Sequence, residues 1–233
     1  IARRAKQELQ DGAVINFGFG IPDQVASLIA SEGSSGRYYQ TIEHGTYGGS
    51  LLTGNLFGYA KNPTCMIDGP SQFDFYSGGG LDIAFLGFGQ IDAQGSVNVS
   101  KLGGVTVGPG GFIDIAQNAR KVVFCGTFDA KGTRLETGEG RLEVSHPGSI
   151  RKLVREVDQV TFSGPQALVQ NQEVLYVTER AVFRLTPEGV TLTEVAPGVD
   201  LERDVLQQMD FVPRIPDTPK PMEARCFLKE QRG

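Results

Sequence analysis

The sequence predicts an α/β protein with an open, mainly parallel sheet, flanking helices and an added β-rich C-terminal segment. Short apolar runs of strand length alternate with helical or glycine-rich stretches as far as Cys125. Several of these runs end in a glycine or a polar residue, and in such sheets ligands bind beyond the carboxyl ends of the strands. From about residue 134 onward strand-like patterns dominate. No internal repeat is evident, and we expect residues 1–233 to form one domain that includes this strand-rich part.

The first part of the chain is expected to build the parallel core from a strand, a glycine loop and a helix. Pro22 suits the first turn of the helix that follows the glycine loop, and Gln94-Gly95 marks a hairpin. In order, the expected elements are helix 1–9, strand 13–17, glycine turn 18–23, helix 24–31, strand 38–42 and loop 46–58. They continue with strand 65–68, loops 72–76 and 78–80, strand 82–86, hairpin 91–99, glycine loop 108–112, helix 113–119 and strand 121–125.

The sequence pattern of the second part of the chain is mainly that of strands. Its alternating pattern predicts a β-ribbon over 134–144, and Pro187-Glu-Gly189 has the composition of a hairpin turn. The remaining expected elements are strands 159–163, 174–178, 181–185 and 190–195, a helix over 201–209 and a proline-rich tail over 213–221.

Composition excludes several classes of protein. The net charge of −5 argues against a nucleic-acid binder, which normally has a basic face. No apolar run reaches about 18 residues, so we expect no membrane span. The three cysteines are widely spaced, which predicts reduced, buried thiols in a cytoplasmic protein. Because the chain begins at Ile1 and not at Met, we expect an N-terminal segment to precede it.

Two glycine loops could bring main-chain N–H groups to a ligand. Gly18-Phe-Gly-Ile-Pro22 follows a strand and opens a helix, where N–H groups and the helix dipole attract an anion. It lacks the third glycine of a dinucleotide fingerprint and is too short for a Walker loop. Gly108-Pro-Gly-Gly-Phe112 could direct N–H groups at a developing negative charge. A tight structural turn is the alternative for both.

Glu43 is the carboxylate best placed for chemistry. It follows an apolar strand and precedes Gly45, Gly48 and Gly49, so it can be partly desolvated, which strengthens a carboxylate nucleophile. The alternative is an exposed glutamate in a turn. His44 is expected to be a bystander, because neighbours on an extended chain point to opposite faces.

Other kinds of catalytic site find little support. His146 lies in a turn-like segment and is expected at the surface. Two distant histidines and three scattered cysteines do not have metal-ligand spacing, so we expect no metal. The Gly-x-Ser-x-Gly elbow of a serine hydrolase is absent from the sequence.

These features, in this order, resemble the C-terminal or β-type half of class I CoA-transferases, most closely the propionate/acetate CoA-transferase branch. The resemblance runs from Ile1-Ala-Arg-Arg-Ala5 to near Phe227. Its most specific segments are Asn16-Phe-Gly-Phe-Gly-Ile-Pro22, Ile42-Glu-His-Gly-Thr-Tyr-Gly-Gly49 and the run from Gln72 to Gly87. Shorter matches are 110–113, 122–128 and 174–189.

The resemblance implies a role for each of the singled-out residues. Glu43-His-Gly45 occupies the place of the family's nucleophilic glutamate in its Glu-x-Gly context. The departures from the usual flank are His44, Thr46 and Tyr47, which bear on acyl-group preference. The first loop implies backbone donors near the thioester, and the second implies contacts with CoA. The carried-over residues are Gly18, Gly20 and Ile21 in the first loop, Gly110 and Gly111 in the second, and Lys131 as a further approach to CoA, with a solvated loop lysine as the alternative.

The implied activity is transfer of coenzyme A between a short-chain acyl-CoA and a free carboxylic acid through a glutamyl-CoA thioester on Glu43, with no metal. The implied partner is the α-type half, as a separate subunit or as the other half of one chain, within a homo- or hetero-oligomer. We expect little activity from the chain alone. Two alternatives remain: an acyl-CoA hydrolase on the same scaffold, and a non-catalytic ligand-binding module of the same fold.

Overall fold

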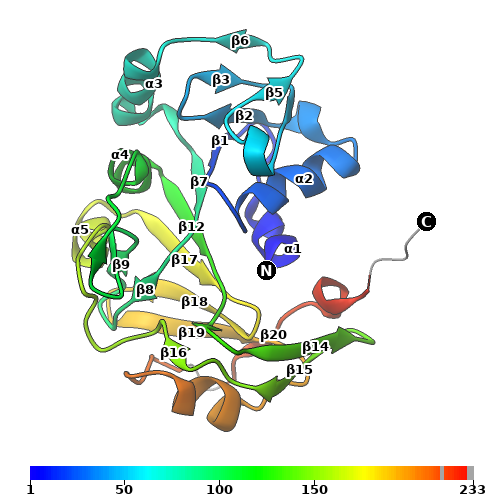
Figure 1. Cartoon of the computed structure of the whole chain (residues 1–233), viewed down its shortest axis with the longest axis vertical. Helices are drawn as coiled ribbons and strands as arrows, with labels where there is room; N and C mark the ends of the chain where they lie inside the picture. The colour runs from blue at the N-terminus through cyan, green and yellow to red at the C-terminus, as the bar shows by residue number, and fades with distance from the viewer. Residues whose placement is uncertain (216–217, 230–233) are drawn as a thin grey trace.

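A ten-stranded sheet forms the centre of the molecule (Figure 1). The computed structural model describes residues 1–215 and 218–229. Across the sheet the strand order is β20-β19-β18-β17-β12-β7-β1-β2-β3-β6. Their bounds are β1 Val14–Phe17, β2 Tyr39–Ile42, β3 Thr46–Tyr47, β6 Cys65–Met66, β7 Ile83–Leu86, β12 Lys121–Cys125, β17 Glu173–Val177, β18 Ala181–Thr186, β19 Gly189–Val195 and β20 Lys220–Pro221.

The strands from β2 across to β17 run parallel to one another. Strands β7 and β12 are buried along their whole length, and β7 and residues 122–125 of β12 are the continuous apolar runs typical of strands buried on both faces. Antiparallel strands flank this core on both sides, with β3 and β6 beyond β2, and β18 and β19 beyond β17. The predicted fold class, an open α/β sheet with a parallel core, is confirmed.

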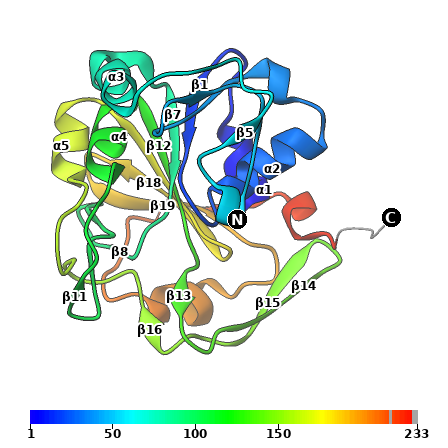
Figure 2. The same cartoon turned by 45° about the horizontal axis from the view of Figure 1, so that its top comes forward.

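Helices cover both faces of the sheet (Figure 2). The helices α1 (Ala2–Ala5) and α2 (Asp23–Ser31) lie on one face, and α3 (Gly69–Phe75), α4 (Phe112–Asn118) and α5 (Gly164–Val169) lie on the other. A separate cluster of buried apolar side chains fills each interface. The two clusters share the central strands, whose alternate side chains point to opposite faces.

The connections between the main elements contain small two-stranded antiparallel ribbons. The predicted hairpin over 91–99 is present as β8 (Gln90–Ile91) with β9 (Val97–Asn98), and the predicted ribbon over 134–144 as β14 (Arg134–Gly138) with β15 (Arg141–His146). The remaining ribbons pair β4 (Ser50–Leu51) with β5 (Ala60–Lys61), β10 (Lys101–Leu102) with β11 (Val105–Thr106), and β13 (Asp129–Ala130) with β16 (Ile150–Arg151).

Two expected elements are wrong. Residues 72–76 are not a loop but lie in helix α3 and in the π-helical turn Tyr76–Gly80 that continues it. The helix begins where the Asp68 carboxylate accepts hydrogen bonds from the N–H and the hydroxyl of Ser71, and Pro70 lies in its first turn. Residues 159–163 form no strand beyond an isolated bridge at Phe162, because Ser163 caps the start of α5.

The C-terminal part differs from expectation in detail. The predicted helix over 201–209 is a π-helical turn, Leu201–Val205, followed by a 3₁₀ turn, Leu206–Gln208. In the proline-rich tail over 213–221, Lys220–Pro221 pairs with β19 as the sheet's edge strand. Pro216 and Asp217 of that tail lie outside the described residues.

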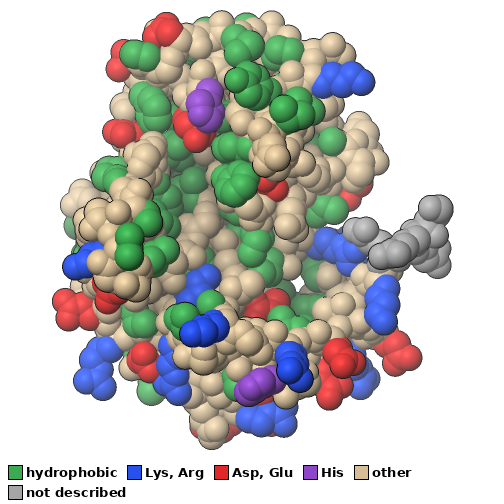
Figure 3. Space-filling view, viewed as in Figure 1, with side chains coloured by type: hydrophobic (Ala, Val, Ile, Leu, Met, Phe, Trp, Pro, Cys, Tyr) green, Lys and Arg blue, Asp and Glu red, His purple; other side chains and the backbone are tan. Residues whose placement is uncertain are grey.

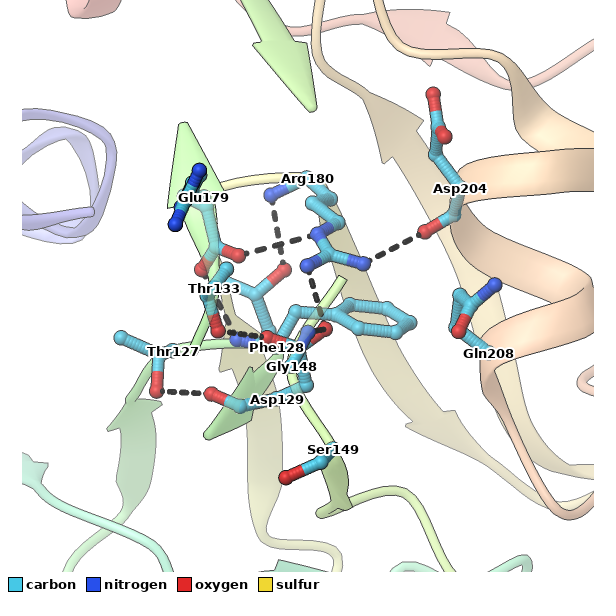
Figure 4. A network of polar contacts seen from close by, with 12 residues as sticks. Thr127, Phe128, Asp129, Thr133, Gly148, Ser149, Glu179, Arg180, Asp204 and Gln208 are labelled. Atoms are coloured by element: carbon cyan, nitrogen blue, oxygen red, sulfur yellow. Dashed lines mark hydrogen bonds and ion pairs between the residues drawn. The ribbon is translucent and has the colours of Figure 1, made fainter. Parts of the chain in front are cut away.

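A buried ionic network fastens the β-rich segment to the parallel core (Figure 4). Arg180, in the turn between β17 and β18, is completely buried and lies 2.6 Å from the carboxylate of Asp129 in β13. Its guanidinium also donates to the carbonyl of Asp204 and lies 3.3 Å from the carboxylate of Glu179. Burial raises the pKa of Glu179. Three segments far apart in the chain therefore meet around one cation.

Candidate active site

A cavity of about 430 Å³ opens at the carboxyl ends of β1, β2 and β7. This is the edge where parallel sheets bind their ligands. Glu43, Gly18, Gly110 and Gly111, all predicted site residues, share its lining. The rest of the lining is mostly apolar and consists of Asn16, Phe19, Leu86, Gly87, Phe88, Gly89, Val99, Leu102, Pro109, Phe112 and Ile115.

The turn after β2 determines the place of Glu43. The N–H of Gly45 donates to the Ile42 carbonyl at 2.9 Å, and the Gly45 carbonyl accepts from the N–H of Ile67 at 2.9 Å. Gly45 has a φ of +101°, and a Cβ there would lie 2.0 Å from the Ile67 carbonyl oxygen. Only glycine fits both constraints. Glu43 itself is half-buried.

Asn16 holds one oxygen of the Glu43 carboxylate. In the parallel pairing of β1 and β2, Asn16 lies opposite Thr41, and Glu43 follows Thr41 by two residues, on the same face. The side-chain amide of Asn16 donates to Oε2 of Glu43 at 3.2 Å. Asn16 is fully buried. No hydrogen bond from the described residues reaches the other carboxylate oxygen, Oε1, so it is available for chemistry.

A buried tyrosine stands behind Asn16. The amide of Asn16 also donates to the hydroxyl of Tyr76 at 3.2 Å, and that hydroxyl lies 2.6 Å from Oγ1 of Thr41. Burial raises the pKa of Tyr76 to about 12, so the phenol stays protonated near neutral pH. The amide of Gln72 is buried close to the Tyr76 hydroxyl, yet neither its nitrogen nor its oxygen has a hydrogen-bond partner among the described residues.

The two glycine loops differ in the donors that they offer. No hydrogen bond within the described residues uses the N–H groups of Gly110 and Gly111, and both glycines line the cavity. A Cβ at Gly111 would lie 2.7 Å from the ring of Phe73, so this loop packs closely on α3. In the first loop, the N–H of Gly18 donates to the Phe85 carbonyl at 2.8 Å and continues the sheet. Its expected role as a backbone donor to a ligand is therefore not supported in this conformation.

Gly20 and Ile21 of the first loop lie outside the cavity lining. The N–H of Gly20 donates to the carboxylate of Asp23 at 3.3 Å, so it too is already paired. The N–H of Ile21 makes no hydrogen bond within the described residues, but Ile21 does not line the cavity.

Lys131 and the two histidines also lie apart from the cavity. Lys131 is exposed, has a φ of +63°, and its carbonyl accepts from the N–H of Ser149 at 2.9 Å. Its predicted contact with CoA stays a prediction. His44 is exposed and packs its ring on Gly58, where a Cβ would lie 2.8 Å from Nδ1. His146 is exposed, as expected.

Sequence reasoning missed Asn16, Thr41 and Tyr76 as parts of the site. A signal for two of them was present: Asn16 is the polar residue of the otherwise apolar strand β1, and Thr41 is a buried polar residue of β2. The third depended on α3, which was expected to be a loop. Tyr47, noted for its place beside Glu43, is half-buried with its ring against that of Phe75, at 6.0 Å between centroids.

The described residues hold neither a cluster suited to a metal ion nor a helix suited to a membrane. No group of three or more His, Cys, Asp or Glu side chains in them could hold a metal ion. None of their helices is long and apolar enough to cross a membrane.

Fold and cavity together define an α/β protein with a carboxylate at the carboxyl edge of a parallel sheet, and comparison with known proteins identifies its family. No protein-family model matches the chain. It is 43% identical over 233 residues to the acetate CoA-transferase YdiF of Escherichia coli O157:H7, covering 100% of this chain and 44% of YdiF. It is 45% identical over 238 residues to the caffeate CoA-transferase of Acetobacterium woodii, covering 100% of this chain and 45% of that protein.

A third relative matches almost end to end. The β subunit of the acetate CoA-transferase of E. coli K12 is 31% identical over 211 residues, covering 86% of each chain. The crystal structure of YdiF in a thioester complex with CoA has a TM-score of 0.91 and 43% identity, covering 97% of this chain and 43% of that one. The chain belongs to the class I CoA-transferase family. It corresponds to the β-type part of that family and spans less than half the length of YdiF.

Proposed function

We propose that this chain is the catalytic β-type part of an acyl-CoA:carboxylate CoA-transferase that acts on short-chain acids through a thioester on Glu43, and that residues 1–233 act as one domain. One observation carries the proposal: Oε2 of Glu43 is held by Asn16 while Oε1 is left without a partner among the described residues, inside a largely apolar cavity. A carboxylate that is oriented and partly desolvated is suited to nucleophilic attack. The thioester complex of YdiF with CoA supports the same chemistry.

The reaction runs in two symmetrical halves. Oε1 of Glu43 attacks the acyl-CoA carbonyl, the C–S bond breaks, and a mixed anhydride and the CoA thiolate form. The thiolate then attacks Cδ of Glu43, the bond from Cδ to the bridging oxygen breaks, and the first acid leaves as its carboxylate. A second acid reverses both steps. Both nucleophiles are already anions, so no general base is needed.

The groups around Glu43 have different roles in this reaction. When Cδ of Glu43 is attacked, negative charge develops on Oε2, the atom to which Asn16 donates. Asn16 is therefore aimed at a developing oxyanion. The N–H groups of Gly110 and Gly111 are candidates for the same task at the acyl carbonyl. The apolar lining excludes water, which would otherwise hydrolyse the thioester.

The proposal includes a complementary α-type half. The chain spans 44% of YdiF, and its β-subunit relative implies a second subunit. Apolar side chains are exposed near the cavity, among them Phe19 at 68%, whose ring contacts Phe57. Hydrophobic side chains gather on the upper half of the molecule in Figure 3, whereas charged side chains crowd the lower half. Exposed apolar patches of this kind mark interaction surfaces.

A mass measurement tests the proposal. The chain, assembled with its α-type half, is mixed with acetyl-CoA in the absence of an acceptor acid. We expect the intact mass of this chain to rise by the mass of one CoA less one water, and peptide mapping to place the adduct on Glu43. Transfer without any adduct on Glu43 would falsify the covalent route, and hydrolysis of acetyl-CoA without transfer would favour the hydrolase.

Replacing Asn16 with alanine tests the oxyanion role. Asn16→Ala removes the donor to Oε2, so kcat is expected to fall by about 100- to 1,000-fold, the usual effect of one lost oxyanion donor. The KM for acyl-CoA should change little, because the contact strengthens only in the transition state. Steady-state kinetics measure both. A rise in KM at constant kcat would show that Asn16 serves ground-state binding instead.

A further inference from the structure

We infer that Tyr76 is a positioning residue for this reaction: its hydroxyl holds the side-chain amide of Asn16 with the amino group toward Glu43. The inference rests on the proposed function and adds a residue from a different element. Tyr76 lies at the junction of α3 with the π-helical turn, is fully buried, and does not line the cavity. It acts through Asn16 and does not touch the reacting atoms.

The direction of each hydrogen in the chain of contacts is determined. The hydroxyl of Thr41 donates to the main-chain carbonyl of Ile15 at 2.8 Å, and a carbonyl can only accept. Thr41 must therefore accept the hydrogen of Tyr76, at 2.6 Å between the oxygens. The Tyr76 oxygen is then left to accept from Asn16, at 3.2 Å. A phenol with a pKa of about 12 does not lose this hydrogen at working pH.

The amide of Asn16 consequently has one favourable orientation. Its amino group donates one hydrogen to Glu43 and the other to Tyr76, while its Oδ1 has no partner among the described residues. If the amide turned by half a revolution, Oδ1 would face two acceptor oxygens, the Glu43 carboxylate and the Tyr76 hydroxyl. Glu43 and Tyr76 therefore both favour the same orientation of the Asn16 amide.

The hydrogen bond from Asn16 to Tyr76 matters most when Glu43 is not charged. As a carboxylate, Glu43 attracts the Asn16 amino group strongly, because hydrogen bonds to charged groups are the stronger kind. In the anhydride and the thioester, Glu43 carries a neutral carbonyl and attracts it less. Tyr76 stays unchanged through the cycle, so it keeps the donor aimed at Oε2 until the next attack. Its effect should be greatest on consumption of the thioester.

The test is a double-mutant cycle on consumption of preformed glutamyl-CoA, measured by rapid quench with acetate, in the chain assembled with its α-type half. Tyr76→Phe removes only the hydroxyl, and the ring keeps its contacts with Phe73 and Phe75. We expect the rate of thioester consumption to fall about fivefold to tenfold, the usual effect of one neutral hydrogen bond, with KM for acetate unchanged. In an Asn16→Ala background the same change should alter the rate less than about twofold, because the group through which Tyr76 acts is gone.

Tyr176→Phe is the matched control. Tyr176 is equally buried and donates its hydroxyl hydrogen to the Gly95 carbonyl at 2.5 Å, and it does not line the cavity. It should lose stability as Tyr76→Phe does, without slowing thioester consumption. If Tyr76→Phe does not fold, Thr41→Val carries the test by removing the acceptor of the Tyr76 hydrogen. A slower rate in Thr41→Val supports the inference, and an unchanged rate overturns it.

Two results overturn the role of Tyr76 while leaving the proposed function intact. One is a Tyr76→Phe variant that consumes the thioester at the wild-type rate. The other is an equal loss from Tyr76→Phe with and without Asn16, which would mean that Tyr76 supports the fold independently. Failure of the proposed function is distinguishable, since the wild-type protein would then form no thioester at all.

Discussion

Glu43→Gln is expected to lower the rate of CoA transfer by on the order of 10⁴- to 10⁶-fold, the loss seen when a covalent nucleophile is removed. Glutamine has the shape of glutamate and keeps a carbonyl oxygen to accept from Asn16, so the turn between β2 and β3 should be preserved. Its amide is not a nucleophile and cannot form the anhydride. Steady-state transfer rates and the intact mass after incubation with acetyl-CoA measure the effect.

Glu136→Gln is the control for this variant. Glu136 is exposed on the β14–β15 hairpin and lies outside the cavity lining, so the same chemical change there should leave transfer and adduct formation at wild-type levels. A Glu43→Gln variant that still acquires one CoA would place the nucleophile elsewhere.

Asp129→Ala is expected to destabilise the folded chain by about 3–5 kcal/mol, as when one partner of a buried ion pair is removed. The variant leaves the guanidinium of Arg180, with 0% exposure, without its closest carboxylate. It also removes the acceptor for the Gly148 N–H at 2.8 Å and for the Thr133 hydroxyl at 2.5 Å. Urea unfolding followed by circular dichroism measures the loss.

An exposed ion pair in the same chain provides the comparison. Arg151 and Asp210 lie 2.6 Å apart with side chains 44% and 39% exposed, so Asp210→Ala should cost at most about 1 kcal/mol. Equal losses from Asp129→Ala and Asp210→Ala would mean that water reaches Arg180. Near-wild-type stability of Asp129→Ala would mean that Glu179, 3.3 Å from Arg180, takes over as the counter-charge.

Most of the fold could be predicted because each strand of the parallel core has its own short apolar run in the sequence. A strand such as β12 is buried along its whole length, and the apolar run over its residues 122–125 is enough to identify it. Helix α3 escaped prediction because its glycine and aromatic composition is poor in helix formers, and the capping by Asp68 carries the signal instead. The strand expected over 159–163 was wrong for the complementary reason, since Ser163 ends the run by capping α5.

The candidate site could be predicted only as a set of separate features. Glu43 and the glycines were found from local patterns, and the structure brings Glu43, Gly18, Gly110 and Gly111 to one cavity. The roles of their N–H groups depend on which carbonyls they meet, and the N–H of Gly18 is occupied by Phe85, a residue of another strand. The partner of Glu43, Asn16, follows from the register of β1 against β2, which no single segment specifies.

The glycines around Glu43 also determine where this loop can change during evolution or design. A Cβ at Gly45, Gly48 or Gly49 would lie 2.0 to 2.5 Å from neighbouring atoms, and each has a positive φ, so a library of variants at these three positions should contain mostly inactive members. The side chains of His44 and Tyr47 pack against Gly58 and Phe75. A search for altered acid selectivity would therefore randomise His44 and Tyr47 and leave the three glycines untouched.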